Sequence, residues 1–160
     1  MSRDLYTASV RRKYNRNAMF YDVMDRMVRD AWRRMVVTQA FDRVLEVGVG
    51  TGKNLPFYDP AKVRSVTGVD ISPGMLVRAR RKECSVPREL LELDAQNLPF
   101  KDDAFDTVLA TCVFCTVPDP LAALREVRRV CRPGGRILLL EHVRIDRPLV
   151  GTLMDVLELH

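Results

Sequence analysis

Short apolar runs alternate along the chain with segments whose apolar residues recur at helical spacing. The runs are rich in β-branched residues and predict strands at 43–47, 64–70, 89–93, 105–111 and 137–140. Helices are predicted at 55–59, 73–82 and 120–131. Strands that alternate with helices are typical of a doubly wound α/β domain with a mostly parallel sheet.

The residues at the ends of the predicted helices support these boundaries. Ser72 and Asp119 are good N-caps, and each precedes a proline, which suits the first helical position. Pro133-Gly134-Gly135 is expected to end the last helix. The inward positions of the 73–82 helix are Met75, Leu76 and Ala79. The inward positions of the 120–131 helix are Leu121, Leu124, Val127 and Cys131.

Residues 17–37 form a predicted amphipathic helix. Its apolar positions are Phe20, Val23, Met24, Met27, Val28, Ala31 and Met35. Its other face carries Asp22, Asp25, Arg26, Arg29, Arg33 and Arg34. We expect the apolar face to pack on the domain. Because arginines cluster in this segment, a lid over the site or a helix that contacts a membrane surface is the alternative.

Length and charge restrict the class of protein. The 160 residues suit one domain with a real core, and apolar residues make up 47% of them. The 26 basic and 21 acidic residues leave a net charge of +5, a mild preference for anionic partners that does not indicate nucleic acid. No apolar run reaches about 18 residues, and the N-terminus lacks a signal-peptide core. We expect a cytoplasmic protein, with peripheral contact at the inner membrane surface as a further expectation.

The cysteines give no metal site. Cys112 and Cys115 have the spacing of half a zinc site, but no second pair and no histidine cluster accompanies them. We expect thiols that pack in the core at the end of a strand, in a reducing cytoplasm.

The first predicted strand leads into a loop with glycine at every second position, at Gly48, Gly50 and Gly52. Glycine lets the backbone turn sharply and approach a ligand closely, although a purely structural turn uses glycine as well. Asp70 ends the next apolar run about 20 residues later, where α/β nucleotide sites keep a carboxylate for a ribose. This combination favours a nucleoside site.

The glycine spacing narrows the choice of nucleoside. A P-loop needs Lys-Ser/Thr after its last glycine, whereas Lys53-Asn54 follows here. The dinucleotide fingerprint is G-x-G-x-x-G, so a dehydrogenase is a distant alternative for this G-x-G-x-G loop. Ligands of doubly wound sheets bind outside the carboxyl ends of the strands. The candidate residues at these predicted ends are Gly48, Asp70, Asp94, Thr111 and His142.

Residues 46–52 (EVGVGTG) and 69–76 (VDISPGML) resemble the first two motifs of the class I S-adenosylmethionine-dependent methyltransferases. The resemblance extends from about residue 14 to residue 145 and is closest to the branch that methylates quinones, phospholipids and small thiols. It implies a Rossmann-like fold with an N-terminal helical lid, S-adenosylmethionine as cofactor and S-adenosylhomocysteine as product. It also implies an enzyme that methylates a small or lipid-like acceptor. The alternative is a cofactor-binding module without its own acceptor site, acting as a partner or regulatory subunit.

The expected site residues are assigned to the ribose, methionine and adenine parts of this cofactor. Asp70 is positioned to bond both ribose hydroxyls. The backbone of 48–50 would pass under the methionine part, and Glu46 would organise the loop or meet the amino group. The resemblance implies that Asp94 takes the adenine amino group and that the Ala95 N–H takes a ring nitrogen. The expected cofactor-binding residues are Tyr14, Tyr21, Glu46, Gly48, Val49, Gly50, Thr51, Gly52, Asn54, Asp70, Ile71, Met75, Asp94, Ala95, Thr111 and Cys112.

Several of these residues have a second interpretation. Ile71 and Met75 would wall the adenine, although Met75 alone also fits core packing. Thr111 and Cys112 would face the methionine part. Asp94 alone fits a strand-end turn, so the joint spacing supports the assignment. The residues assigned to the lid are Tyr14 and Tyr21.

His142 is the candidate general base. The positive sulfur already activates the methyl group, so the protein must mainly align nucleophile, methyl and sulfur, and a strong base is optional. His142 titrates near neutrality by type, although a lone histidine is more often structural. Glu141 is a similar case.

The end of the chain departs from the resembled fold, which has seven strands against the five predicted here. The fifth strand would therefore have an exposed edge. We expect a chain that is truncated, or that completes itself through another chain in a homo-oligomer contact. The contact helix would carry Leu149, Val150, Leu153, Val156 and Leu157 on one side. The expected division is an arm or lid at 1–37, a cofactor-binding core at 38–145 and a C-terminal helix at 146–160.

Overall fold

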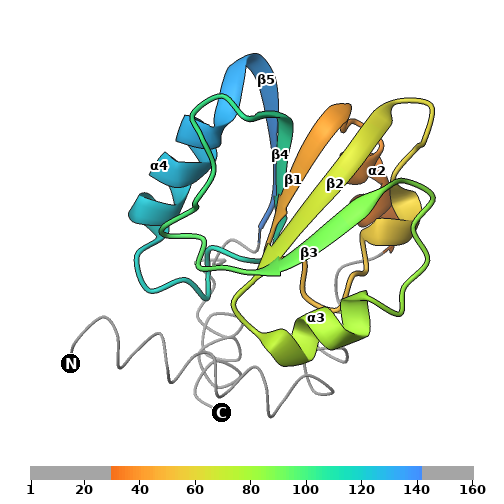
Figure 1. Cartoon of the computed structure of the whole chain (residues 1–160), viewed down its shortest axis with the longest axis horizontal. Coiled ribbons are helices and arrows are strands. Elements are labelled where there is room, and N and C mark those ends of the chain that lie inside the picture. The colour runs from red at the N-terminus through yellow and green to blue at the C-terminus, as the bar shows by residue number, and fades with distance from the viewer. Residues whose placement is uncertain (1–29, 142–160) are drawn as a thin grey trace, which may run out of the picture.

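The computed structural model describes residues 30–141, which form one sheet with helices on both faces (Figure 1). The expectations for Tyr14, Tyr21, His142 and the 146–160 helix lie outside the described residues. The strands are β1 (Asp42–Val47), β2 (Val63–Asp70), β3 (Arg88–Glu92), β4 (Phe105–Thr111) and β5 (Cys131–Leu140). The helices are α2 (Asp30–Val37), α3 (Pro73–Ala79) and α4 (Pro120–Val130), with a short 3-10 helix η2 (Leu55–Phe57).

The strand order is β3-β2-β1-β4-β5, and every neighbouring pair is parallel. The chain moves outward from β1 to β3 and then returns to β4 on the other side of β1. Val47 pairs with Val69 on one side and Ala110 on the other, so the carboxyl ends of β1, β2 and β4 are level. Ligands bind at such a switch point. The predicted doubly wound α/β fold is confirmed.

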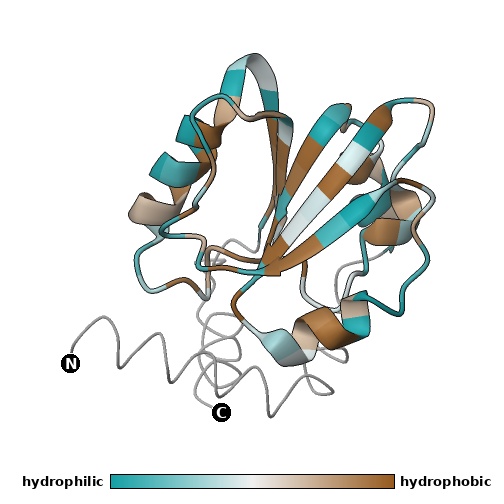
Figure 2. Ribbon diagram, in the orientation of Figure 1, coloured by the Kyte–Doolittle hydropathy of each residue, from teal (hydrophilic) through white to brown (hydrophobic). Residues whose placement is uncertain are grey.

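The sheet separates two apolar clusters. Val44 belongs to one and Leu45 to the other, because successive strand residues face opposite sides. Residues of α2, η2 and α3 join the cluster of Val44, and residues of α4 join the cluster of Leu45. Figure 2 shows apolar segments along the strands and hydrophilic residues along much of α4.

The predicted helix caps are confirmed. The Ser72 hydroxyl accepts a hydrogen bond from the Met75 N–H at 3.3 Å, and Asp119 Oδ1 accepts one from the Ala122 N–H at 2.9 Å. Proline occupies the first turn of both helices. Capping side chains of this kind satisfy N–H groups that have no partner within the helix.

Helix α3 ends at Ala79, earlier than the predicted end near Lys82. The reason is a contact with β3. The Arg88 guanidinium donates to the carbonyls of Arg80 at 3.0 Å and Lys82 at 2.6 Å, which holds the following residues in a turn.

The predicted faces of two helices are wrong in part, and for the helix expected at 17–37 only residues 30–37 are described. In α2, Met35 is 61% exposed and Arg33 only 3% exposed, the reverse of the expectation, because Arg33 finds hydrogen-bond partners inside the protein. In α4, Leu121 is 64% exposed. The buried residues of α4 are Ala123, Val127 and Val130. Of the predicted stripe, Val127 and Cys131, the first residue of β5, are buried, whereas Leu121 and Leu124 are exposed.

Strand β5 begins at Cys131, before the predicted 137–140 segment. Pro133-Gly134-Gly135 does not end the helix, which already stops at Val130, but forms an irregularity where the β4–β5 register shifts. A Cβ at Gly135 would lie 2.8 Å from the Asp106 carbonyl oxygen, so only glycine fits there. Beyond this point β5 pairs regularly with β4.

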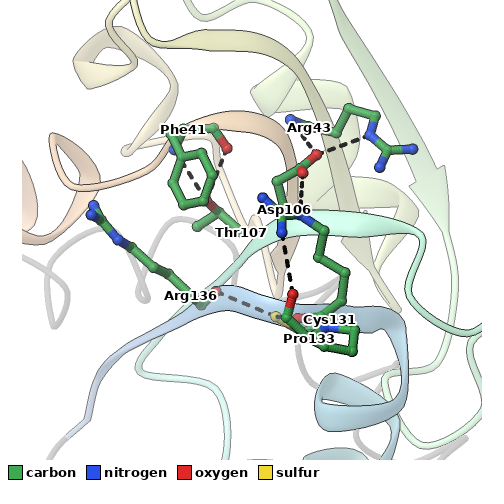
Figure 3. A network of polar contacts seen from close by, with 8 residues as sticks. Phe41, Arg43, Asp106, Thr107, Cys131, Pro133 and Arg136 are labelled. Carbon is green, nitrogen blue, oxygen red and sulfur yellow. Dashed lines mark hydrogen bonds and ion pairs between the residues drawn. The ribbon is translucent and has the colours of Figure 1, made fainter.

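A polar network joins the amino ends of the strands, opposite the ligand side (Figure 3). Asp106 accepts hydrogen bonds from Arg43 Nε at 2.9 Å and Arg132 Nε at 2.5 Å. Burial alone would raise the pKa of Asp106, but these arginine bonds outweigh it and lower the pKa. The guanidinium of Arg136 lies 5.1 Å from the ring centre of Phe41. The network therefore ties β1, β4, β5 and the segment after α2 together.

Strand β5 is an edge strand among the described strands. Its Ile137 and Leu139 side chains are 43% and 44% exposed. An exposed apolar edge is a surface that proteins usually cover.

Candidate functional site

The glycine loop after β1 has a left-handed backbone at each glycine, with φ of +66° at Gly48, +54° at Gly50 and +79° at Gly52. A Cβ at Gly48 would overlap Val113, and a Cβ at Gly52 would lie 3.0 Å from the Ala79 Cα. At Gly50 the nearest atom is the Gly48 carbonyl oxygen at 3.9 Å, so this position faces open space. Two glycines thus allow tight packing, and Gly50 leaves room beside the loop.

Asp70 connects the loop to the start of α3. One carboxylate oxygen accepts the Gly50 N–H at 2.9 Å, and the other accepts the Ser72 N–H at 2.8 Å. Burial raises the pKa of Asp70, and the two backbone hydrogen bonds reduce that rise. The carboxylate is therefore held at the level ends of β1 and β2, next to the open side of Gly50.

Glu46 lies beneath the loop and is 1% exposed. One carboxylate oxygen accepts the Tyr58 hydroxyl at 2.7 Å, and the other accepts Asn54 Nδ2 at 2.9 Å. Burial raises the pKa of Glu46 to about 7, although these bonds and the charge of Arg33 lower it. The pKa of Tyr58 is raised as well, mainly by burial and secondly by the negative charge of the nearby Glu46. Of the two roles expected for Glu46, these contacts favour organising the loop.

Arg33 of α2 completes this buried network. Its Nη1 donates to Asn54 Oδ1 at 3.2 Å and to Thr111 Oγ1 at 3.1 Å. Asn54 Nδ2 also donates to Thr111 Oγ1, at 3.1 Å. The structure thus brings together Glu46, Asn54 and Thr111, all expected in the site. Sequence analysis did not identify Arg33 or Tyr58, and helical periodicity placed Arg33 on the outer face.

The remaining residues expected in the glycine loop are buried. Val49 is 4% exposed and donates its N–H to the Val69 carbonyl at 3.0 Å. Thr51 is 8% exposed, and Gly52 packs against α3. These residues shape the loop from below.

Asp94 is held by Gln96, which sequence analysis did not identify. The Gln96 N–H donates to Asp94 Oδ1 at 2.9 Å, and its side-chain amide donates to both carboxylate oxygens at 3.0 Å. Gln96 Oε1 accepts the Asp119 N–H at 3.1 Å, so the turn after β3 is linked to the cap of α4. Asp94 and the following Ala95 are half-buried.

The backbone turns sharply after β4. Cys112 has a φ of +56°, a strained conformation for a residue with a side chain. The Cys112 N–H donates to the Leu140 carbonyl at 2.8 Å, and Glu141 Oε1 accepts the N–H groups of Val113 at 2.9 Å and Phe114 at 3.4 Å. Strain of this kind is common at functional sites.

The other expected contacts differ in exposure. Met75 is 4% exposed, whereas Ile71 is half-buried beside it at the start of α3. Cys112 is half-buried and Cys115 is exposed, so the expectation that both thiols pack in the core is wrong for Cys115. The loop after the strand end turns outward there. Within residues 30–141, no three His, Cys, Asp or Glu side chains are grouped to hold a metal ion.

The helices of residues 30–141 are all too short or too polar to span a bilayer.

Comparison with known proteins identifies relatives of this chain. A family description for a methyltransferase domain matches residues 45–139. The phosphatidylethanolamine N-methyltransferase of Cereibacter sphaeroides is 41% identical over 146 residues, which are 87% of this chain and 70% of that protein. The demethylmenaquinone methyltransferase of Thermus thermophilus is 39% identical over 132 residues, 76% of this chain and 60% of that protein.

A solved structure has the same fold. It is an S-adenosylmethionine-dependent methyltransferase from Thermotoga maritima, with a TM-score of 0.60 and 30% identity over 81% of this chain and 60% of that chain. This chain therefore spans less than two thirds of that structure and of the Thermus thermophilus relative. The family match covers the strands that hold the glycine loop, Asp70 and Asp94, so the resemblance of the loop motifs is confirmed. The chain belongs to the class I S-adenosylmethionine-dependent methyltransferases, in the methyltransferase domain family.

Proposed function

We propose that this protein binds S-adenosylmethionine at the carboxyl ends of β1 to β4 and transfers its methyl group to a small or lipid-like acceptor. The acceptor class is a phospholipid amine, a quinone or a thiol. The observation that carries the proposal is the Asp70 carboxylate held beside the open face of Gly50. The names of the relatives, which act on phosphatidylethanolamine and demethylmenaquinone, favour a lipid-like acceptor.

The described residues fit this cofactor. A Cβ at Gly50 would enter open space, and the Gly50 N–H is bonded to the Asp70 carboxylate. Each Asp70 oxygen accepts one backbone N–H and keeps a lone pair, so it can still accept a ribose hydroxyl. Asp94, fixed by Gln96, offers an acceptor for the adenine amino group. We assign the adenine ring nitrogen to the Ala95 N–H.

The methionine part of the cofactor is assigned to the backbone of 48–50, with Thr111 and Cys112 beside it. When bound, the cofactor supplies a methyl group on a positively charged sulfur. The protein's task is then alignment of the acceptor, because a well-oriented nucleophile accounts for much of the barrier. The strained turn at Cys112, held by Glu141, keeps the end of β4 in one conformation.

Glu141 is better suited to this structural role than to proton transfer, because one of its oxygens already accepts two backbone N–H groups. We propose His142 as the general base for acceptors that lose a proton. A histidine titrates close to neutral pH, as this role requires.

We also propose two surface contacts. Trp32 and Met35 are 50% and 61% exposed on α2, an amphipathic arrangement that suits peripheral contact of the 1–37 arm with a membrane surface. The 146–160 helix would form a homo-oligomer contact that covers the β5 edge. Light scattering tests the second contact, since Leu153→Asp should reduce self-association.

Incubation of the full chain with S-adenosylmethionine and an acceptor panel tests the proposal. The panel holds phosphatidylethanolamine, a demethylated quinone and a small thiol, and mass spectrometry detects the methylated product. We expect product with at least one lipid-like acceptor. Cofactor binding without product on any acceptor would instead favour a cofactor-binding module that serves a partner. Absence of cofactor binding would contradict both functions.

A further inference from the structure

We infer that Arg33 is a positioning residue of the cofactor site, which acts through Asn54 and Thr111 on the underside of the glycine loop. The inference rests on the proposed function, because it names a residue that prepares the proposed site. Arg33 belongs to α2, which precedes the matched family region at 45–139. The seating of α2 would thereby be coupled to cofactor affinity.

The geometry joins three separate parts of the chain. Arg33 Nη1 donates to Asn54, the residue before η2, and to Thr111, the last residue of β4. All three side chains are buried, with exposures of 3%, 1% and 8%. Buried hydrogen-bonding groups lose free energy when a partner is removed, so these contacts hold α2, the loop and β4 in one arrangement.

The Asn54 amide has a single orientation in this network. Its oxygen accepts from Arg33, and its nitrogen donates to Glu46 at 2.9 Å and to Thr111 at 3.1 Å. Rotation of the amide would bring its NH₂ group against the Arg33 donors and its oxygen against the Glu46 carboxylate. Asn54 therefore links Arg33 to Glu46, so that a shift of Arg33 would also move the hydrogen-bond donor of Glu46. The same loop is closed by a hydrogen bond from the Leu55 N–H to the Gly52 carbonyl at 3.2 Å.

The charge of Arg33 matters as well as its hydrogen bonds. The charged and titratable groups that act on Glu46 are Arg33 from α2, Tyr58 after η2 and Asp70 at the end of β2. Burial is the largest influence and raises the pKa of Glu46, while Arg33 lowers it. Without Arg33, Glu46 would hold its proton to higher pH. A protonated carboxyl can no longer accept from both Tyr58 and Asn54 with the same strength, so the network would rearrange.

The test compares Arg33→Met with a control on the same helix, Arg34→Met. Arg34 is exposed and stacks on Phe57 with its guanidinium carbon 5.0 Å from the ring centre. Calorimetry with S-adenosylmethionine should show affinity weakened on the order of tenfold for Arg33→Met and little changed for Arg34→Met. A second pair avoids dependence on one variant. Thr111→Val should weaken binding, and Thr111→Ser, which keeps the hydroxyl, should restore it.

A pH profile separates a positioning role from loss of folding. Urea unfolding is measured across pH for two pairs of proteins. The first pair is the wild type and Glu46→Gln. The second pair is Arg33→Met and the Arg33→Met, Glu46→Gln double variant. The contribution of Glu46 to stability should continue to fall to higher pH when Arg33 is absent.

Two outcomes would overturn the inference: wild-type affinity in Arg33→Met, or an equal loss in Arg34→Met. Absence of cofactor binding by the wild-type protein would overturn the proposed function itself. In that case the unfolding profile still decides whether Arg33 controls the ionisation of Glu46.

Discussion

Glu46 ionises unusually because it is buried beneath the glycine loop, and the effect of burial exceeds that of its hydrogen-bond donors. Its pKa is raised from 4.5 to about 7 by burial, against the effect of Tyr58, Asn54 and Arg33. Between these pH values the unfolded chain releases this proton while the folded chain keeps it. Glu46 therefore lowers stability progressively as the pH rises from about 4.5 to about 7, and its contribution is constant above that range.

Glu46→Gln should remove this dependence. We expect the free energy of unfolding of the variant, relative to wild type, to rise by on the order of 1–3 kcal/mol between pH 5 and pH 8, since one pKa unit corresponds to about 1.4 kcal/mol. Urea unfolding at both pH values measures it. A difference that is the same at both pH values would show that Glu46 does not change its proton on unfolding.

Gly48 and Gly50 of the loop should respond differently to alanine. Both Gly48→Ala and Gly50→Ala add a Cβ at positive φ, which costs about 1–2 kcal/mol. Gly48→Ala should be more destabilising, because its Cβ would overlap Val113, whereas the Gly50 Cβ would enter open space. Gly50→Ala should mainly reduce cofactor binding. Thermal unfolding and calorimetry together separate the effects, and equal stability losses with unchanged binding by Gly50→Ala would contradict this account.

The candidate site could be predicted only where its residues follow a local pattern. Gly50 and Asp70 were predictable because glycine spacing and a strand-end carboxylate are visible in the sequence. Arg33 was not predictable, because its partner Thr111 is 78 residues away. An arginine on an amphipathic helix is also expected to lie at the surface. Gln96 was also missed, since its link to Asp119, the N-cap of α4, joins residues that are 23 positions apart.

At the scale of elements, strands were easier to predict than helix faces. Strand β4 spans its predicted residues 105–111, because every residue in it is buried and the apolar run is nearly continuous. Ser72 and Asp119 cap their helices as expected. The predicted inward face of α4 was wrong at Leu121 and Leu124, because an apolar stripe does not reveal which side the sheet covers. Small Ala123 lies inside, and large Leu121 lies outside.

The network around Asp106 at the amino ends of the strands should make the stability of the fold depend on pH in the acid range. Asp106 has a lowered pKa, so its stabilising contribution is present at neutral pH and is lost as the pH falls below about 3.8 through the folded pKa. Asp106→Asn should lower the free energy of unfolding at pH 7 by about 1–2 kcal/mol, a discounted value because Arg43 and Arg132 are 48% and 38% exposed. Asp103→Asn, at an exposed acidic residue, is the control. Chemical unfolding that gives equal effects for both variants would contradict the network's role.

At the scale of the whole molecule, charge and exposed apolar residues suggest where lipid would meet the protein. The net charge is +5, and α2 exposes Trp32 and Met35. Co-sedimentation with liposomes should rise with anionic lipid and fall with salt. Met35→Glu should reduce it, and Val77→Glu, at a 48% exposed residue on α3, should not. Binding that ignores lipid charge and salt would leave α2 with a packing role alone.

The central claim is that the level ends of β1 and β2 hold the cofactor through Asp70, and calorimetric titration with S-adenosylmethionine tests it most directly. The wild-type protein should bind the cofactor. Asp70→Ala should weaken binding by about 1–3 kcal/mol, because the ribose hydroxyls lose their acceptor, while Glu89→Ala at an exposed position on β3 should bind normally. Equal affinity for wild type and Asp70→Ala, or no binding by the wild-type protein, would contradict the account.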